Sequence, residues 1–415
     1  MRTLYICYFG LREPLVQTQV LPYLRQLSET GIEVSLLTFE PDRQRAWPRA
    51  LVEEWSARLQ MMGIRWLSLP YHKRPSVPAT SYDIFAGARL AARLIRREGV
   101  EVIHARSHVP MAMALLAQQW ASCRLVFDIR GLMAEEYADA GIWAEGSPPF
   151  RVIKRVERVG IKRADQLVVL TNRLRDWLVE HGLKEAASIE VIPCCVDFAR
   201  FEESEALDAL AGASRFEVVY AGSVTGLYML EEMGRFFLEL RREEPRARLR
   251  IMTTSSAQDA TSTLRRVGLD DQDFLVGAVP PAQVPAHLRR SHLGLSFRKP
   301  TFSQIAASPT KVPEYLAAGL PVVCNAGIGD TDELLVAEKV GVVIEAFDRE
   351  AYRKAALAAL ALSRDPGIRA RTVASARRHF DLVEVGGARY RNVYRRLEEN
   401  REQKAVGGRQ YAVKQ

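Results

Sequence analysis

The sequence predicts an α/β protein with two doubly wound, parallel-sheet domains of the Rossmann type, and three observations lead to this prediction. The first is length, because 415 residues exceed what one hydrophobic core usually supports and suggest two domains of about 200 residues each. The second is the alternation of short apolar and amphipathic segments in both halves of the chain. The third is a glycine-containing loop, at Gly10 and at Gly222, after the first apolar segment of each half.

Composition is that of an ordinary globular protein, with 48% hydrophobic and 26% charged residues. No apolar run approaches the roughly 20 residues that cross a bilayer. The chain opens with Met1-Arg2-Thr3 and a strand-like segment, so we expect no secretory signal. We therefore expect a cytoplasmic protein.

Cysteine spacing and net charge narrow the classes of partner. The five cysteines show no Cys-x-x-Cys spacing, so we expect reduced, buried thiols and neither a disulfide framework nor a zinc site. A net charge of +8 and a pI near 9.3 imply attraction to anions. Nucleic acid, an anionic membrane leaflet and phosphorylated small molecules all remain open on these grounds.

In the first half, period-2 and buried apolar segments predict strands, and amphipathic segments predict helices between them. Since such units form a parallel sheet, the loops after the strands share the carboxyl edge, where these folds bind ligands. We expect strands at 3–8, 33–38, 64–67, 102–104, 125–128, 167–170 and 189–192, and helices at 17–30, 45–62, 82–98, 111–120, 150–163 and 173–181.

Two neighbouring strands of this half end in polar clusters. His104 and Arg106 lie at the end of one strand, and Asp128 and Arg130 at the end of the other. Ionisable residues at this edge are placed for ligands. For His104, a hydrogen-bonded residue at a strand edge remains an equal alternative.

Two further segments of the first half stand out. Residues 133–147 form a longer connection than the fold needs, and we interpret it as a loop covering an acceptor. The helix expected at 150–163 carries six cations among apolar residues. Its charged face fits either solvent, the simpler interpretation, or an anionic membrane surface.

The second half repeats the plan after a crossing expected at 196–214. We expect strands at 217–221, 249–253, 274–276, 293–296 and 322–325, and helices at 228–241, 349–363, 367–380 and 382–397. The expected domains are 1–200, completed by a C-terminal helix at 382–400, and 215–381, followed by a disordered tail at 401–415.

The most informative stretch runs from Ser308 to Val323. Pro313 is tolerated only within about the first turn of a helix, so Thr310 is the expected N-cap. The amides of residues 310–312 would then point outward beside Ser308, and Lys311 adds a positive charge, which makes this helix start a phosphate site. Glu314, one turn further, would accept two neighbouring hydroxyls of a ribose.

This stretch, together with the upstream Phe297-Arg298-Lys299, resembles the nucleotide-sugar site of family 4 glycosyltransferases, which are retaining enzymes of GT-B fold. The resemblance implies that the two domains face each other across a cleft and that Glu314 holds the donor ribose. Two departures exist. The family's second Glu, eight residues earlier, is Ala306 here, and the Arg and Lys that relatives place just beyond the glycine of Gly222 are missing.

Roles follow from this resemblance for the residues already named. We expect Arg298, Lys299 and Lys311 to bind the diphosphate in place of the missing Arg and Lys. Ser223 and Thr225 would donate hydrogen bonds from their hydroxyls. The donor-binding set is therefore Gly222, Ser223, Thr225, Arg298, Lys299, Ser308, Thr310, Lys311 and Glu314. The catalytic candidates are Arg298, Lys299 and Asp128, which falls where many relatives have a cleft histidine, and the acceptor-binding candidates are His104, Arg106 and Arg130.

The expected function is transfer of a sugar, with retention, from a nucleoside-diphosphate sugar to a glycan, lipid-linked or small-molecule acceptor. We expect no metal and no other cofactor, since the Asp-x-Asp triplets at 271–273 and 330–332 begin helices or strands. Expected partners are the donor and the acceptor, without nucleic acid, and with peripheral association at the inner face of the plasma membrane left open. The alternatives are an inactive nucleotide-sugar or glycan-binding protein of the same fold and, less favoured, an epimerase or a phosphorylase.

Overall fold

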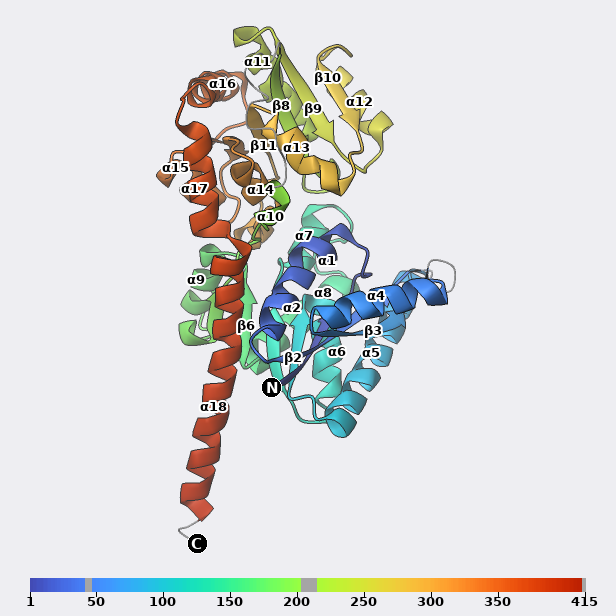
Figure 1. The fold of residues 1–415 in the computed structure, drawn as a ribbon. Helices are drawn as coiled ribbons and strands as arrows, with labels where there is room; N and C mark the ends of the chain where they lie inside the picture. Colours follow the sequence, from blue (N-terminus) through green and yellow to red (C-terminus); the bar gives the residue numbers. More distant parts are fainter. Residues whose placement is uncertain (42–46, 203–214, 413–415) are drawn as a thin grey trace. The chain divides into compact units, whose positions relative to one another are not determined.

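The computed structural model describes residues 1–41, 47–202 and 215–412 (Figure 1). The chain forms two compact units. Unit 1 comprises residues 1–134, 145–192 and 383–415, and unit 2 comprises residues 135–144 and 193–382. The division differs from the expected one mainly in the short segment 135–144, which packs with the second unit.

Unit 1 is built on a seven-stranded parallel sheet in the order β3-β2-β1-β4-β5-β6-β7. The order reverses direction between β1 and β4, as in a doubly wound sheet. Every strand predicted for this half is present, with ends shifted by up to three residues. The strands are β1 (Arg2–Cys7), β2 (Glu33–Glu40), β3 (Ile64–Pro70), β4 (Val102–Arg106), β5 (Arg124–Asp128), β6 (Gln166–Val169) and β7 (Ile189–Val191).

The helices of unit 1 agree with the pattern except at two places. The helix expected at 17–30 is two helices broken at Val20, because Pro22 starts a new helix where its missing N–H needs no partner. The segment 133–147 begins with the short helix α7 (Met133–Asp139) rather than a plain loop. The other helices are α1 (Pro14–Gln19), α2 (Leu21–Ser28), α4 (Arg49–Met61), α5 (Ser76–Glu98), α6 (His108–Ala117), α8 (Pro148–Arg163) and α9 (Asn172–Glu180).

The C-terminal helix α18 (Ala388–Ala412; Figure 1), preceded by a π-helical turn at Leu382–Gly387, belongs to unit 1 and packs against α2 and β7. Its buried Tyr390 and Tyr394 dock it onto the sheet. The helix runs through Ala412, and the disorder expected from 401 stays a prediction. Residues 413–415 lie outside the described part.

Unit 2 contains a six-stranded parallel sheet in the order β10-β9-β8-β11-β12-β13. Its strands are β8 (Phe216–Ala221), β9 (Ala247–Met252), β10 (Phe274–Gly277), β11 (Leu293–Ser296), β12 (Val322–Asn325) and β13 (Gly341–Ile344). Its helices are α10 (Ala199–Glu202), α11 (Leu230–Glu243), α12 (Ala257–Arg266), α13 (Val284–Arg289), α14 (Lys311–Ala317), α15 (Thr331–Ala337), α16 (Arg349–Ser363) and α17 (Ile368–Phe380). The prediction of two doubly wound parallel-sheet domains is confirmed. The rest of the expected crossing, residues 203–214, lies outside the described residues.

Helix α14 is fixed against the unit 2 sheet by its residue Tyr315. The fully buried Tyr315 ring lies over β11, where a Cβ on Gly294 would come within 2.4 Å of it. Only glycine allows this approach. The Tyr315 hydroxyl accepts a hydrogen bond from the Ala221 N–H at 2.8 Å, so α14 is held against the carboxyl end of β8.

No helix in the described part of the chain is both long and apolar enough to cross a membrane.

Candidate functional site

The carboxyl edge of the unit 2 sheet brings two of the predicted cations together. Arg298 follows β11, and Lys311 begins α14. Residues 227–229 pair with residues 297–299 through backbone hydrogen bonds, which holds Tyr228 beside Arg298. Both cations lie against the Tyr228 ring, with the Lys311 Nζ at 4.1 Å and the Arg298 guanidinium carbon at 4.9 Å from its centroid.

Lys311 is a buried cation that lies against two aromatic rings. Its side chain is 5% exposed, and its Nζ also lies 4.9 Å from the Tyr220 ring centroid. No carboxylate in the described residues lies within ion-pair distance of it. Burial lowers the pKa of Lys311 to about 7, the nearby Arg298 adds to this shift, and Glu314 opposes it. Aromatic faces repay only part of the cost of removing an ammonium from water.

Arg298 is positioned by neutral partners. Its Nε donates to Gln304 Oε1 at 2.6 Å and its Nη1 donates to the Tyr228 hydroxyl at 3.3 Å. Its backbone N–H donates to Asn325 Oδ1 at 2.8 Å. The guanidinium is therefore fixed in place while its charge stays unneutralised by any carboxylate in the described residues. Two fixed, unneutralised cations around one ring form a site that suits an anion with two charges.

The glycine loop after β8 lies directly beside Lys311. Gly222 has φ +137°, and a Cβ there would lie 3.5 Å from Lys311 Nζ. Its N–H donates to Met252 O at 2.9 Å, so this N–H is used within the sheet and is not available to a donor phosphate. The exposed hydroxyls of Ser223 and Thr225 are 3.1 Å apart and remain able to contact a ligand.

Helix α14 starts where the sequence predicted, with differences in detail. Thr310 is its N-cap, but its backbone is already helical and its side chain makes no capping hydrogen bond. The Val312 N–H donates to Pro309 O at 3.1 Å, so the expectation that this amide points outward is wrong. Ser308 Oγ accepts a hydrogen bond from Cys194 N at 3.1 Å, which ties the helix start to residues that lead into unit 2.

Glu314 and Lys299 both have protein partners. Glu314 Oε1 lies 2.9 Å from Arg200 Nη1, and each side chain is about a quarter exposed, at 24% and 27%. Lys299 is exposed, and its Nζ donates to the Asp139 carbonyl at 3.3 Å, in the segment that we interpreted as an acceptor loop. Arg200 was missed because only tertiary contact brings it to Glu314. Tyr228 was missed because an aromatic residue entering a helix usually signals core.

In unit 1, Asp128 lies at the centre of a buried polar network. Its Oδ2 accepts hydrogen bonds from the Tyr390 hydroxyl at 2.9 Å and from Arg106 Nη1 at 3.3 Å, and its Oδ1 lies 3.4 Å from Arg130 Nη1. His104 Nε2 lies 3.7 Å from Oδ2. Burial raises the pKa of Asp128, but Arg130, His104 and Arg106 together outweigh it and hold the pKa well below its usual range.

This network is structural in character. Asp128 and His104 are fully buried, Arg106 is 3% exposed, and Tyr390 belongs to α18. Burial also lowers the pKa of His104, which disfavours its charged form. For His104 the geometry supports the alternative of a hydrogen-bonded strand-edge residue. The predicted catalytic role of Asp128 and the acceptor roles of His104, Arg106 and Arg130 gain no support, because docking of the last helix accounts for the network.

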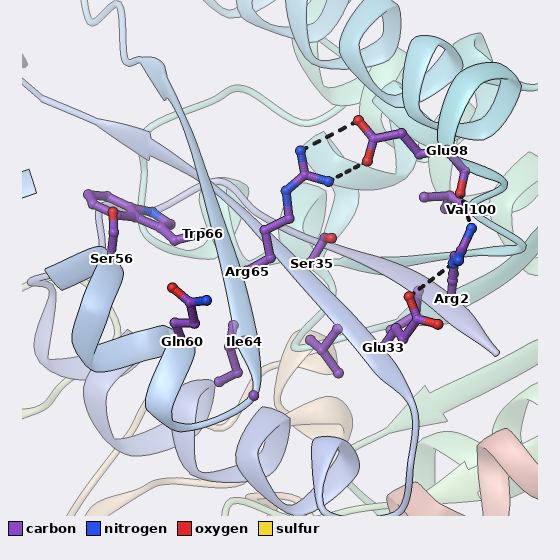
Figure 2. A pocket seen from close by; sticks show the side chains of 13 residues that line it. Arg2, Glu33, Ser35, Ser56, Gln60, Ile64, Arg65, Trp66, Glu98 and Val100 are labelled. Atoms are coloured by element: carbon purple, nitrogen blue, oxygen red, sulfur yellow. Dashed lines mark hydrogen bonds and ion pairs between the residues drawn. The ribbon is translucent and has the colours of Figure 1, made fainter. Parts of the chain in front are cut away.

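Two hollows lie outside these groups. One of about 800 Å³ lies at the amino edge of the unit 1 sheet, where Figure 2 shows Arg2 paired with Glu33 and Arg65 paired with Glu98. Its charges are paired with one another, so it offers no free charge to an anion.

The second hollow, of about 580 Å³, lies on α8 among four cations. One of them, Lys154, pairs with the buried Glu157 at 2.5 Å, and Glu157 also lies 2.9 Å from His108 Nε2. The remaining cations of the helix have no carboxylate within ion-pair distance among the described residues: Arg151, Arg155, Arg158, Lys162 and Arg163.

The aspartates of the two Asp-x-Asp triplets make protein contacts. Asp271 pairs with Arg265 through both oxygens at 2.8 Å, and Asp332 Oδ2 accepts from the Gly327 N–H at 2.8 Å. No group of three or more His, Cys, Asp or Glu in the described part could hold a metal ion. The expectation of a metal-free site stays a prediction.

Comparisons with known proteins bear on the family and the fold. Residues 16–200 match the family model described as Glycosyltransferase Family 4. No curated protein matches the chain in sequence. Among solved structures, sucrose-phosphate synthase from Thermosynechococcus elongatus is similar, with a TM-score of 0.71 and 15% identity over 96% of this chain and 100% of that one.

Two further structures are similar over almost the whole chain. HepE from Anabaena in complex with UDP-glucose has a TM-score of 0.66 and 14% identity, covering 95% of this chain and 99% of that one. A glycosyltransferase from Rickettsia africae has the same TM-score and identity, covering 95% and 98%. The fold is therefore GT-B, and the resemblance to family 4 glycosyltransferases is confirmed. Together these findings support sugar transfer from a nucleotide sugar in general.

Replacing Lys311 with methionine should stabilise the fold. An ammonium whose pKa falls on folding weakens the folded state, so Lys311→Met should raise the free energy of unfolding by about 1–3 kcal/mol at neutral pH. Because the unfolded lysine titrates near its usual value, the gain should shrink as pH rises above 7. Urea unfolding across this range measures it, and a destabilised variant would show that the ammonium has a structural partner.

Replacing Asp128 with asparagine should act on stability first. It leaves Arg106 and Arg130 without their shared carboxylate in a buried site, which costs about 3–5 kcal/mol of unfolding free energy. Denaturant unfolding measures the loss. Asp271→Asn, in an exposed ion pair with Arg265, is the control and should change stability little. Full stability with lost turnover in Asp128→Asn would restore its catalytic role.

Proposed function

We propose that this chain, which matches the family 4 glycosyltransferase model over residues 16–200 and has a GT-B fold, transfers a hexosyl or related sugar, with retention, from a nucleoside-diphosphate sugar to a hydroxyl-bearing acceptor. One observation carries the proposal. Lys311 and Arg298 are fixed around Tyr228 beside the Gly222 loop, and neither has an anionic partner among the described residues. A diphosphate supplies the missing charge.

The same two cations account for the chemistry. When the bond from the anomeric carbon to the diphosphate oxygen breaks, negative charge builds on the leaving group. Lys311 and Arg298 are already in place, in a poorly hydrated site, so they stabilise this charge without reorganisation. The leaving phosphate itself accepts the proton of the attacking hydroxyl. This division of roles requires no protein base near the anomeric carbon.

A uridine donor is the first candidate, because HepE is described in complex with UDP-glucose. Glu314 would hold the two ribose hydroxyls. In the structure its Oε1 faces Arg200, so ribose binding uses the other oxygen or shares Oε1. Arg200 also neutralises a carboxylate that would otherwise repel the neighbouring diphosphate.

The alternative, an inactive binding protein, rests on the two departures from the family pattern. Ala306 is fully buried in the turn Phe302–Ala306, so no carboxylate reaches the site from this position. The absence of the family's Arg and Lys after Gly222 weighs less, because Lys311 Nζ lies next to that glycine. The structure thus supplies a charge at the expected place from another element, which favours the enzyme.

The acceptor and its location are proposed from charge. The unpaired cations of α8 and the hollow between them fit phosphate groups at an anionic membrane surface, where a lipid-linked acceptor would lie. The inner face of the plasma membrane is then the proposed place of action.

Donor binding tests the proposal. Arg298→Ala and Lys311→Ala should weaken UDP binding much more than uridine binding, because only UDP carries the diphosphate, and Glu314→Ala should weaken both. Isothermal titration measures each affinity, and UDP-glucose consumption reports turnover. Binding of UDP without release of UDP from any sugar nucleotide would favour the inactive alternative, and equal losses for UDP and uridine would remove the cations from the phosphates.

The affinity for UDP should also depend on pH. Since the pKa of Lys311 is lowered to about 7, a bound diphosphate restores the proton, and UDP affinity should fall by up to about tenfold per unit as pH rises above 7. Lys311→Arg keeps its charge in this range, so the pH dependence of its UDP affinity reports the titration of UDP alone. The same pH dependence in the wild type and in Lys311→Arg would contradict proton uptake by Lys311.

Membrane association has its own test. Reversal of Arg151, Arg155 and Arg158 to glutamate should abolish flotation with phosphatidylglycerol vesicles. Reversal of Arg89, Arg93 and Arg96, which are exposed on α5, is the matched control and should leave most binding intact. No difference between the two triple variants would remove α8 from the membrane.

A further inference from the structure

A histidine and a buried carboxylate form a hydrogen-bonded pair at the carboxyl edge of the unit 1 sheet. His72 lies two residues beyond β3, and its Nδ1 is 2.6 Å from Asp83 Oδ1. Asp83, on α5, is 1% exposed, whereas the His72 side chain is 44% exposed. One partner is thus buried and the other faces solvent.

Asp83 accepts three hydrogen bonds. Its second oxygen receives the Tyr8 hydroxyl at 2.8 Å and the His72 backbone N–H at 3.0 Å. No lysine or arginine in the described residues lies within ion-pair distance of it. The carboxylate therefore orients the ring through Nδ1, which leaves Nε2 as the ring atom able to hydrogen-bond a ligand. No side chain in the described part occupies Nε2.

Aromatic residues flank the imidazole. Tyr82 meets the His72 ring edge-on at 5.2 Å and is 61% exposed. Tyr71 packs on Tyr8 at 5.3 Å, so the residues after β1 and after β3 meet here. An exposed aromatic ring beside a fixed polar group is the arrangement that binds a pyranose, since the ring packs on its C–H face and the polar group orients a hydroxyl.

The pair does more than a loop anchor requires. Asp83 already ties the loop after β3 through the His72 backbone N–H, and it ties β1 through Tyr8. The Nδ1 contact satisfies the other carboxylate oxygen, which compensates part of the cost of burying Asp83. It also fixes the orientation of a ring that is itself exposed, and a fixed, exposed ring can orient a ligand.

We propose that His72, oriented by Asp83 and flanked by Tyr82, forms an acceptor subsite in which His72 Nε2 hydrogen-bonds a hydroxyl of a glycoside packed on Tyr82. This inference rests on the proposed function, because a glycosyltransferase needs such an acceptor. It assigns the acceptor to the edge formed by β1 and β3 rather than to the buried Asp128 network. Asp83 is a positioning residue that acts through His72.

Saturation-transfer NMR with the full chain tests the subsite, using methyl glycosides of the common hexoses as probes. His72→Asn keeps an N–H donor near the place of Nδ1 and deletes Nε2, so the loop stays tied while the acceptor atom is lost. We expect at least one glycoside to bind the wild type, and its affinity to fall about tenfold in His72→Asn. Tyr82→Ala should lower the affinity similarly.

Phe85→Ala is the control, because Phe85 is 47% exposed one turn further along α5 and packs on Trp120. It should leave glycoside affinity unchanged. Wild-type affinity in His72→Asn, or binding of no glycoside by the wild type, overturns the subsite. UDP titrated into the same samples reports the donor site independently, so loss of the proposed function appears as absent UDP binding, whatever the glycosides do.

Discussion

The ammonium of Lys311, buried with no carboxylate partner among the described residues, is the constraint around which unit 2 is arranged. Its burial follows from packing, because Tyr315 draws the first turn of α14 onto Gly294 and the end of β8. Once the helix is there, Lys311 must lie between Tyr220 and Tyr228. The fold tolerates this cost only if the site gains something else, and a bound diphosphate is the compensating partner that the chemistry suggests.

Asp128 and Lys311 are both buried, but the groups around them indicate different roles. Asp128 in unit 1 is as buried as Lys311, but cations and a tyrosine surround it, and it joins α18 to the sheet. Lys311 has rings and another cation around it. A buried charge that has oppositely charged partners holds structural elements together. A buried charge that lacks them, at the carboxyl edge of a parallel sheet, is a candidate for ligand binding.

Sequence reasoning reached the fold and the start of α14, because apolar periodicity, Pro313 and the spacing of the strands are local signals. It also singled out Arg298 and Lys311, which the structure brings together around the Tyr228 ring. It could not show that Arg200 pairs with Glu314, since 114 residues separate them. Nor could it distinguish a catalytic from a structural role for Asp128. A polar residue at the end of a strand has the same sequence pattern in both cases, and its partner Tyr390 lies 262 residues further along the chain. His72 and Asp83 carried no pattern at all.

Glu314 is the point where these constraints meet. Placed one turn beyond Lys311, its carboxylate would repel a diphosphate at close range, yet a ribose needs such an acceptor. Arg200 resolves the conflict, because pairing at 2.9 Å cancels most of the charge and leaves the second oxygen to accept hydrogen bonds. Partial exposure keeps the pair exchangeable, so the carboxylate can turn toward two hydroxyls without being stranded. In the proposed donor site, the ion pair therefore belongs to the binding apparatus as much as Lys311 and Arg298 do.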